Sequence, residues 1–231
     1  MANKYALLGS GNTGSKIPEL LNADERYTFF NSNNPPTLER LAGHDVIICF
    51  VAGPVLEQYI DILVESNLPV VSGATGIEWP SDLNERLQAS GVTWVWADNF
   101  ALGMNIVKHL IGAINELSSL YHDPTFQIHE IHHVKKLDAP SGTALRWQDW
   151  LQHDAAMSYE REGDVVGTHQ LTLDTEFEKI TLTHEAKDRR IFAHGALWAA
   201  RALLERDLPN GLLPLDYVTA MHRQGEYYVS N

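Results

Sequence analysis

A chain of 231 residues, 44% apolar and 20% charged, is typical of a folded protein with one large or two modest domains. Its 30 acidic and 17 basic side chains give a formal charge of −13, which argues against partners such as nucleic acid or anionic membranes. With Cys49 as the single cysteine, no signal peptide and no apolar run of membrane-spanning length, we expect a cytoplasmic protein without internal disulfides.

The first predicted element is a buried strand at residues 4–9, followed at once by Gly9, Gly11 and Gly14 in the spacing G-x-G-x-x-G. An apolar pattern through residues 17–21 predicts a helix after this turn. Glycines let the backbone approach a pyrophosphate closely, and a helix N-terminus meets its negative charge. The candidate cofactor-binding residues of this loop are Gly9, Ser10, Gly11, Asn12, Thr13 and Gly14.

Four more strands are predicted at residues 27–33, 45–54, 68–76 and 92–100, with helical patterns between several of them. Strands that alternate with helices indicate an α/β fold with a doubly wound parallel sheet, the Rossmann arrangement. Ligands of such sheets lie beyond the carboxyl ends of the strands, although each loop taken singly could be only a tight turn. The relevant loops are residues 50–54, 73–76 and 98–100.

The end of the second predicted strand bears on the choice of cofactor. NAD sites usually have an acidic residue about 20 positions after the glycines, whereas NADP sites have an arginine nearby. Here the chain reads Phe30-Asn31-Ser32-Asn33, so amides such as that of Asn31 would have to bind the ribose. We expect NADH or NADPH as cofactor, with a slight preference for NADH or use of both.

From Met104 the pattern changes to a long amphipathic helix that is expected to lead into a second, smaller α+β domain. Its apolar positions form one stripe, which predicts that this whole stripe faces a core. These positions are Ile106, Val107, Leu110, Ile111, Ile114 and Leu117.

The stretch HEIHHVKKLDAPSGT, residues 129–143, concentrates titratable side chains. His129, Glu130 and His133 fit the H-E-x-x-H template of zinc hydrolases, in which a helix presents two histidines to the metal and a glutamate as base. The further ligands of the extended metzincin form are absent, and a protease would not account for the N-terminal glycines. A zinc site is therefore the weakest interpretation, and we expect no metal.

The second interpretation of this stretch is a strand, a reactive loop and a helix. Residues 125–133 begin with strand-like alternation, although their spacing would also suit a helix. Pro140 would break a preceding helix, and Ser141 is a suitable N-cap for a following one. The free N–H groups of Gly142 and Thr143 would then bind an anion, to which Lys136 adds positive charge. The stretch thus predicts a carboxylate site.

Residues 130–144, EIHHVKKLDAPSGTA, meet every fixed position of the pattern E-x-H-x-x-x-K-x-D-x-P-S-G-T-A. The chain therefore resembles the 4-hydroxy-tetrahydrodipicolinate reductase family, also called dihydrodipicolinate reductases. The segments SGATG, ADNF, REGDVVGTH and HEAKDRRIFAHGALWAA are similar to further family segments, in the same order. The glycine loop departs from the family pattern G-x-x-G-x-M-G, because Leu8 stands where the first glycine would fall.

This resemblance implies an NAD(P)H-dependent reductase of a small cyclic dicarboxylate in diaminopimelate and lysine biosynthesis. In the family, hydride passes to ring carbon 4 and the adjacent carbon is then protonated. The resemblance implies His132 as the general acid, Lys136 as its cationic partner and second proton donor, and a supporting role for Arg189. A histidine with a pKa near neutrality suits such a transfer. It also implies substrate contacts at His133, Ser141, Gly142 and Thr143, and nicotinamide contacts at Gly73, Ala74, Thr75, Ala97, Asp98, Asn99 and Phe100.

The expected architecture is a Rossmann domain of residues 1–103 and 194–231 and a catalytic domain of residues 104–193, whose sheet would also form a homotetramer as in the family. Two alternatives to this function stay open. Another Rossmann-type amino-acid or imine reductase would share the glycine loop but would not need the D-A-P-S-G-T anion site. A non-catalytic nucleotide sensor would not need the intact pair His132 and Lys136.

Overall fold

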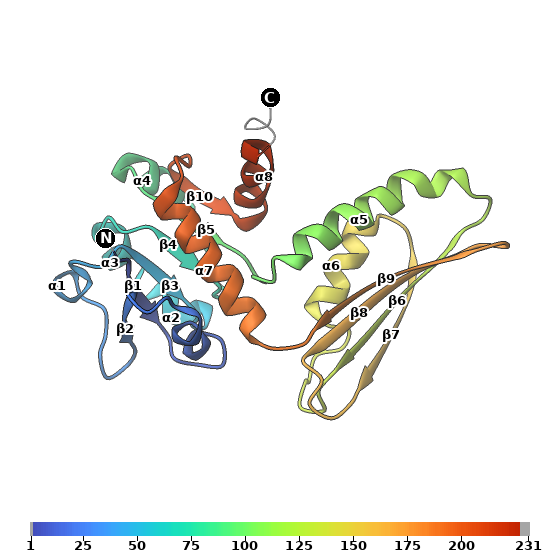
Figure 1. The fold of residues 1–231 in the computed structure, drawn as a ribbon, viewed down its shortest axis with the longest axis horizontal. Coiled ribbons are helices and arrows are strands. Elements are labelled where there is room, and N and C mark those ends of the chain that lie inside the picture. The colour runs from blue at the N-terminus through green and yellow to red at the C-terminus, as the bar shows by residue number, and fades with distance from the viewer. Residues whose placement is uncertain (1, 227–231) are drawn as a thin grey trace. The chain divides into compact units, whose positions relative to one another are not determined.

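The computed structural model describes residues 2–226 and divides the chain into two compact units (Figure 1). The first unit contains the residues up to Ala101 together with those from Arg190 onward, and the second contains Leu102–Arg189. Within the described residues, no helix is both long and apolar enough to span a bilayer.

The first unit is built on a sheet of parallel strands in the order β10-β5-β4-β3-β1-β2. Beside β1 the strand order reverses, because β2 and β3 lie on its two sides, which is the arrangement of a doubly wound Rossmann sheet and confirms the predicted fold class. The sequence did not predict β10, which pairs with β5 at one edge. The strands are β1 (Lys4–Leu8), β2 (Arg26–Phe30), β3 (Val46–Cys49), β4 (Val70–Ser72), β5 (Thr93–Trp96) and β10 (Gly211–Pro214).

Helices cover both faces of this sheet, and each face has its own apolar core. Leu7 and Ile48 belong to a core shared with the C-terminal helices, whereas their neighbours Leu8 and Ile47 belong to a core on the opposite face. Strands buried on both faces explain the continuous apolar runs in the sequence. The helices are α1 (Leu38–Leu41), α2 (Gly53–Glu57), α3 (Ile60–Glu65) and α4 (Leu83–Ser90) on one face, and α7 (Arg190–Glu205) and α8 (Leu215–Glu226) on the other.

The helix predicted directly after the glycine turn is not an α-helix. The chain forms two short 3-10 segments there, η1 (Gly14–Lys16) and η2 (Pro18–Leu20). Pro18 lacks an N–H group, and its ring would clash with the carbonyl of Gly14 in an α-helix that began at that residue. The helical prediction for this segment is therefore wrong.

The second unit is a mixed sheet in the order β7-β6-β8-β9 with two helices on one face (Figure 1). Strand β6 runs parallel to β7 and antiparallel to β8, which in turn pairs antiparallel with β9. This is the predicted smaller α+β unit. Its elements are α5 (Gly103–Leu117), η3 (Ser118–Leu120), β6 (Thr125–His132), α6 (Gly142–Leu151), β7 (Ala155–Arg161), β8 (Gly167–Asp174) and β9 (Lys179–Ala186).

The long helix α5 buries only part of its apolar stripe. Val107 and Ile111 are buried, whereas Ile106, Leu110 and Leu117 are 65%, 45% and 54% exposed. The stripe is wider than the surface that α6, η3 and β9 cover, and these are the elements of its unit that α5 contacts most among the described residues. The prediction that the whole stripe faces a core is therefore wrong for one side of the helix.

Candidate active site

The loops predicted to bind the cofactor all follow the carboxyl ends of strands in the first sheet. Leu8 pairs with Cys49, Cys49 with Ser72, and Ser72 with Trp96, so the last residues of β1, β3, β4 and β5 are aligned. Because these strands are parallel, the loops that follow them meet at this carboxyl edge. The structure thus brings the glycine loop together with the loops that begin at residues 73 and 97.

The glycine loop offers backbone groups rather than side chains. Gly9 has a φ of +100°, and a Cβ there would overlap with the carbonyl oxygen of Phe50, while a Cβ on Gly14 would overlap with the carbonyl oxygen of Gly9. In the described part of the chain, the N–H groups of residues 10–13 make no hydrogen bond. Such N–H groups in a tight loop suit a phosphate. Since η1 is so short, anion binding here would depend on this loop more than on a helix dipole.

The other two loops are supported by a pair of aromatic rings. Phe50 and Phe100 pack edge to face with ring centroids 5.9 Å apart, and a Cβ on Gly73 would overlap with the Phe50 ring. Phe100 is buried in the core, so its ring is not available to a ligand. Asn99 is also engaged, because its Oδ1 accepts a hydrogen bond of 2.8 Å from the N–H of Ala101.

At the end of β2, Asn31 organises a tight turn. Its Oδ1 accepts hydrogen bonds from the N–H groups of Asn33 and Asn34, at 2.9 and 3.1 Å. The side-chain oxygen is thereby used within the loop, which leaves the amide NH₂ as the group that can face a ribose. The turn offers a hydrogen-bond donor without charge at the position where an NAD site usually has a carboxylate.

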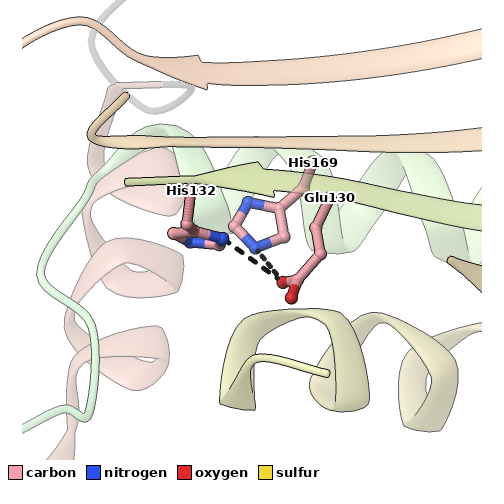
Figure 2. Close-up of side chains that lie close together, drawn as sticks. All are labelled: Glu130, His132 and His169. Atoms are coloured by element: carbon pink, nitrogen blue, oxygen red, sulfur yellow. Dashed lines mark ion pairs between the residues drawn. The ribbon is translucent and has the colours of Figure 1, made fainter. Parts of the chain in front are cut away.

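In the second unit, two histidines face one buried carboxylate (Figure 2). Glu130 Oε2 lies 3.5 Å from His132 Nδ1 and 3.4 Å from His169 Nε2. Glu130 and His132 are two positions apart on β6 and so share a face, while His169 lies opposite Glu130 on β8. The three residues are 0%, 8% and 4% exposed, which places a polar cluster where apolar core residues would be expected.

Ser141 connects this cluster to the start of α6. Its hydroxyl accepts a hydrogen bond of 3.1 Å from the N–H of Ala144, which confirms the predicted N-cap. Its own N–H donates to Glu130 Oε1 at 2.9 Å, and its Oγ lies 3.1 Å from His169 Nε2. Among the residues that the structure describes, the N–H groups of Gly142 and Thr143 have no hydrogen-bond partner. This helix end is therefore free to receive an anion.

Two basic side chains lie around the cluster. Lys136 Nζ is 2.8 Å from both carboxylate oxygens of Asp138. Arg161, at the end of β7 opposite His132, donates to the Asp138 carbonyl at 2.7 Å and lies 3.4 Å from Glu130 Oε1. Local sequence patterns gave Arg161 no role, although it begins the family-like segment REGDVVGTH. Only the pairing of β6 with β7 reveals its position.

The pKa shifts in the cluster have clear physical causes. Burial acts to raise the pKa of Glu130, but the hydrogen bonds from Ser141 and the electrostatic attraction of the two histidines lower it overall, so the carboxylate is ionised. Burial lowers the pKa of His132, and Glu130 opposes this change. Burial, followed by the proximity of His132, lowers the pKa of His169 to about 4, so that His169 is neutral near pH 7.

The H-E-x-x-H stretch of residues 129–133 does not form a metal site of the protease type. His129 and Glu130 lie on a strand rather than a helix, and His129 Nδ1 is 2.8 Å from Ser158 Oγ on the adjacent strand. Side-chain atoms of Glu130, His132 and His169 do lie within 4.8 Å of one another. The positive charges of Lys136 and Arg161 beside them disfavour a cation there.

A scan against protein families matches residues 103–218 to "Dihydrodipicolinate reductase, C-terminus". A 4-hydroxy-tetrahydrodipicolinate reductase of Christiangramia forsetii is 31% identical over 222 residues, which cover 87% of this chain and 92% of the relative. The enzyme of the same name from Stenotrophomonas maltophilia strain R551-3 is 37% identical over 166 residues, which cover 70% of this chain and 68% of the relative.

Solved structures give the same fold. A dipicolinate-bound dihydrodipicolinate reductase from Paenisporosarcina sp. TG-14 superimposes with a TM-score of 0.74 at 18% identity, covering 94% of this chain and 99% of that chain. A DAP dehydrogenase of C. glutamicum in complex with DAP reaches a TM-score of 0.54 at 11% identity, covering 99% of each chain. At these identities the likeness concerns the fold alone.

Proposed function

Since the chain belongs to the 4-hydroxy-tetrahydrodipicolinate reductase family and is an NAD(P)H-dependent oxidoreductase, we propose that it reduces dihydrodipicolinate to tetrahydrodipicolinate by a mechanism centred on residues 130–143. NAD(P)H supplies a hydride to ring carbon 4, and a proton is added to the adjacent carbon. The observation that carries this proposal is the position of His132, at the end of β6 beside an N-capped helix with unpartnered N–H groups.

His132 acts as the general acid in this proposal. Hydride addition to a conjugated imine moves negative charge across the ring, so a nearby imidazolium can supply the proton that the adjacent carbon needs. Lys136 and Arg161 add positive charge near this carbon and stabilise the developing anion. The pairing of Lys136 with Asp138 supports a location of this ammonium beside the proposed substrate site.

The substrate carboxylate is held by the first turn of α6. Ser141 is buried and caps the helix, so the N–H groups of Gly142 and Thr143 point to a fixed location. These donors and the positive end of the helix dipole suit one carboxylate of a cyclic diacid. His133, half-buried directly after β6, contributes a further contact to the substrate.

For the cofactor, we expect NADH and NADPH to be used with a modest difference in efficiency. The glycine loop of residues 9–14 would hold the pyrophosphate, and the loops at 73–75 and 97–100 the nicotinamide end. The free amide NH₂ of Asn31 can donate to a ribose hydroxyl or to a 2′-phosphate. A neutral donor at this position supports use of both cofactors.

A homotetramer formed through the sheet of the second unit is the expected assembly. Its helices lie on one face of this sheet only (Figure 1). The other face carries half-buried or exposed threonines on β8 and β9, at positions 168, 172, 181 and 183. Light scattering coupled to size-exclusion chromatography measures the assembly, and a monomer at micromolar concentration would refute the expectation.

The activity is tested by NADH and NADPH oxidation with freshly generated dihydrodipicolinate. We expect turnover by the wild type and losses in kcat of about 10²- to 10⁴-fold for His132→Gln and Lys136→Ala, the range for a lost proton donor or a lost electrostatic contact. Lys135→Ala, an exposed neighbour of Lys136, is the matched control and should retain activity.

Three outcomes would contradict the proposal. A wild type that binds NADH without oxidising it would favour the nucleotide sensor. Turnover of other amino or imino acids but not of dihydrodipicolinate would favour a different Rossmann reductase. Variants of His132 and Lys136 that match the wild type would show that the chemistry lies elsewhere.

A further inference from the structure

Glu130 is fully buried and ionised, and burial of a charge is costly unless it is compensated. Its Oε1 accepts the N–H of Ser141 at 2.9 Å and lies 3.4 Å from Arg161. Its Oε2 makes no hydrogen bond within the described residues and faces two imidazoles. One of its oxygens is thus committed to the anion-binding turn, and the other is directed at the histidines.

The two histidines differ in how readily they can carry a proton opposite Oε2. His169 is enclosed by β8, Trp147 and Ser141, and burial keeps its ring neutral. His132 lies at the very end of β6, where the strand gives way to the loop. The negative charge of Oε2 therefore favours protonation of His132 over protonation of His169.

The orientation of the His132 ring assigns a different environment to each of its nitrogens. Nδ1 is buried against Glu130. Nε2 lies on the side of Gly167, where a Cβ would be only 2.9 Å from it, so any side chain at this position would crowd the ring. With Nδ1–H directed at the carboxylate, Nε2 is the nitrogen left to exchange a proton with a ligand.

We propose that Glu130 is a positioning residue for the reduction. Its Oε2 orients the His132 ring through Nδ1 and favours the protonated form of the ring, while its Oε1 fixes the Ser141 turn that receives the substrate carboxylate. The inference rests on the proposed function, because it takes His132 as the acid. One carboxylate thereby links the proton donor to the anion site. This assigns a role to the family-matched glutamate that the sequence left without one.

The charges around His132 show why Glu130 is needed. Lys136, Arg161 and His133 all disfavour a positive charge on the His132 ring. Asp138, the other carboxylate of this loop, is paired with Lys136. His169, on β8, is neutral. Glu130 is therefore the carboxylate that offsets these cations at His132, and without its charge the pKa of His132 falls.

Glu130→Gln tests this role with little change in shape. A glutamine can still accept the N–H of Ser141, whereas its NH₂ would donate to His132 Nδ1 and oppose the imidazolium. Glu160→Gln is the matched control, because Glu160 is an exposed residue of β7 with the same charge, and the ion pair of its side chain within the described residues is with His129. Both variants are first checked for folding by near-ultraviolet circular dichroism.

The first measurement needs no substrate. The His132 ring is titrated by NMR in histidine-labelled protein, with His132→Gln used to assign the signal. We expect Glu130→Gln to lower the pKa of His132 by about one unit or more, as the loss of an opposite charge within about 4 Å does, and Glu160→Gln to leave it unchanged. An equal pKa in the wild type and in Glu130→Gln would overturn the inference.

The second measurement is the pH profile of kcat/KM. Because the acid must be protonated, activity falls as the pH rises through the pKa of His132, and Glu130→Gln should move this falling limb to lower pH by a similar amount. The KM for dihydrodipicolinate should change little, whereas Glu130→Ala, which also frees the Ser141 N–H, should raise it. An equal loss at every pH with an unmoved limb would indicate a merely structural role and refute the proposal.

The two proposals fail in different ways. If the wild type does not turn over dihydrodipicolinate, the proposed function is wrong, while the NMR titration still decides whether Glu130 charges His132. If the wild type turns over and Glu130→Gln behaves like Glu160→Gln in both measurements, the function stands and the role of Glu130 is wrong.

Discussion

The loop of residues 9–14 and the loop of residues 132–143 would hold their ligands with different parts of the chain. The first presents backbone N–H groups and has no room for additional side-chain atoms at Gly9 or Gly14. The second presents titratable side chains that pair with carboxylates, His132 with Glu130 and Lys136 with Asp138. Changes in the first loop should therefore act through steric overlap, and changes in the second through charge and pH.

Of the substitutions that follow, Gly14→Ala should have the largest effect, because the new Cβ would overlap with the backbone of Gly9, which cannot rotate away. We expect NADH affinity to fall by about 100-fold, which corresponds to roughly 3 kcal/mol, at every pH. Fluorescence titration with NADH measures this, and Gly112→Ala, a helical site with open space around it, is the control. Normal affinity in Gly14→Ala would mean that the loop does not bind the cofactor.

The buried histidine cluster should make folding stability depend on pH. Unfolded His169 binds a proton near pH 6.5, whereas the folded state does so only near pH 4. Between these values the unfolded state holds more protons, so the free energy of unfolding should fall as the pH falls, by at most about 1.4 kcal/mol per pH unit from this residue.

Urea denaturation of the wild type and His169→Gln at pH 7 and pH 5 measures this contribution. The variant should lose less stability between the two pH values than the wild type does. In the variant, the lowered pKa values of His44, His132 and His184, which burial also affects, leave a smaller dependence of the unfolding free energy on pH, with the same sign. Equal slopes in both proteins would refute the prediction.

Gly167→Ala combines the two kinds of effect, since a steric change acts there on a titratable group. A Cβ would lie 2.9 Å from His132 Nε2 and 3.2 Å from its Cδ2, so the ring must shift by a few tenths of an ångström. We expect kcat to fall about tenfold, because small misplacement of a catalytic group is costly. NADH affinity should stay unchanged, and a kcat like that of Gly112→Ala would refute the prediction.

Asn31→Asp should have the smallest effect. An aspartate can accept the same hydrogen bonds from Asn33 and Asn34, while its second oxygen can accept one from a ribose hydroxyl and repel a 2′-phosphate. We expect the ratio of kcat/KM for NADPH to that for NADH to fall several-fold, on the order of 1 kcal/mol. An unchanged ratio would mean that this turn does not face the ribose.

Local sequence patterns predicted those features that depend on neighbouring residues. Apolar runs predicted the parallel strands, and the Pro140-Ser141 pair predicted the start of α6. The features that were missed depend on strand pairing or on what covers a surface. The four-residue β10 is too short for a periodic signal, and the role of Arg161 follows only from the register of β7 against β6.

The wrong predictions have a similar origin. Apolar spacing around Ile17 resembled a helix, although Pro18 prevents one. The apolar stripe of α5 indicated burial, but no spacing within a helix reveals how much of it neighbouring elements cover. His169 lies in the family-like segment REGDVVGTH, but only the antiparallel pairing of β6 with β8 sets it opposite Glu130.

The ion pair between Lys136 and Asp138 has a consequence for how the substrate enters. This ammonium is paired with a carboxylate of the same loop, and the side chain of that residue, Asp138, is 61% exposed. In the proposed mechanism, Lys136 can act on the substrate only after its ammonium has moved away from Asp138. Substrate binding would then include the cost of separating this ion pair, which is small because Asp138 is largely exposed.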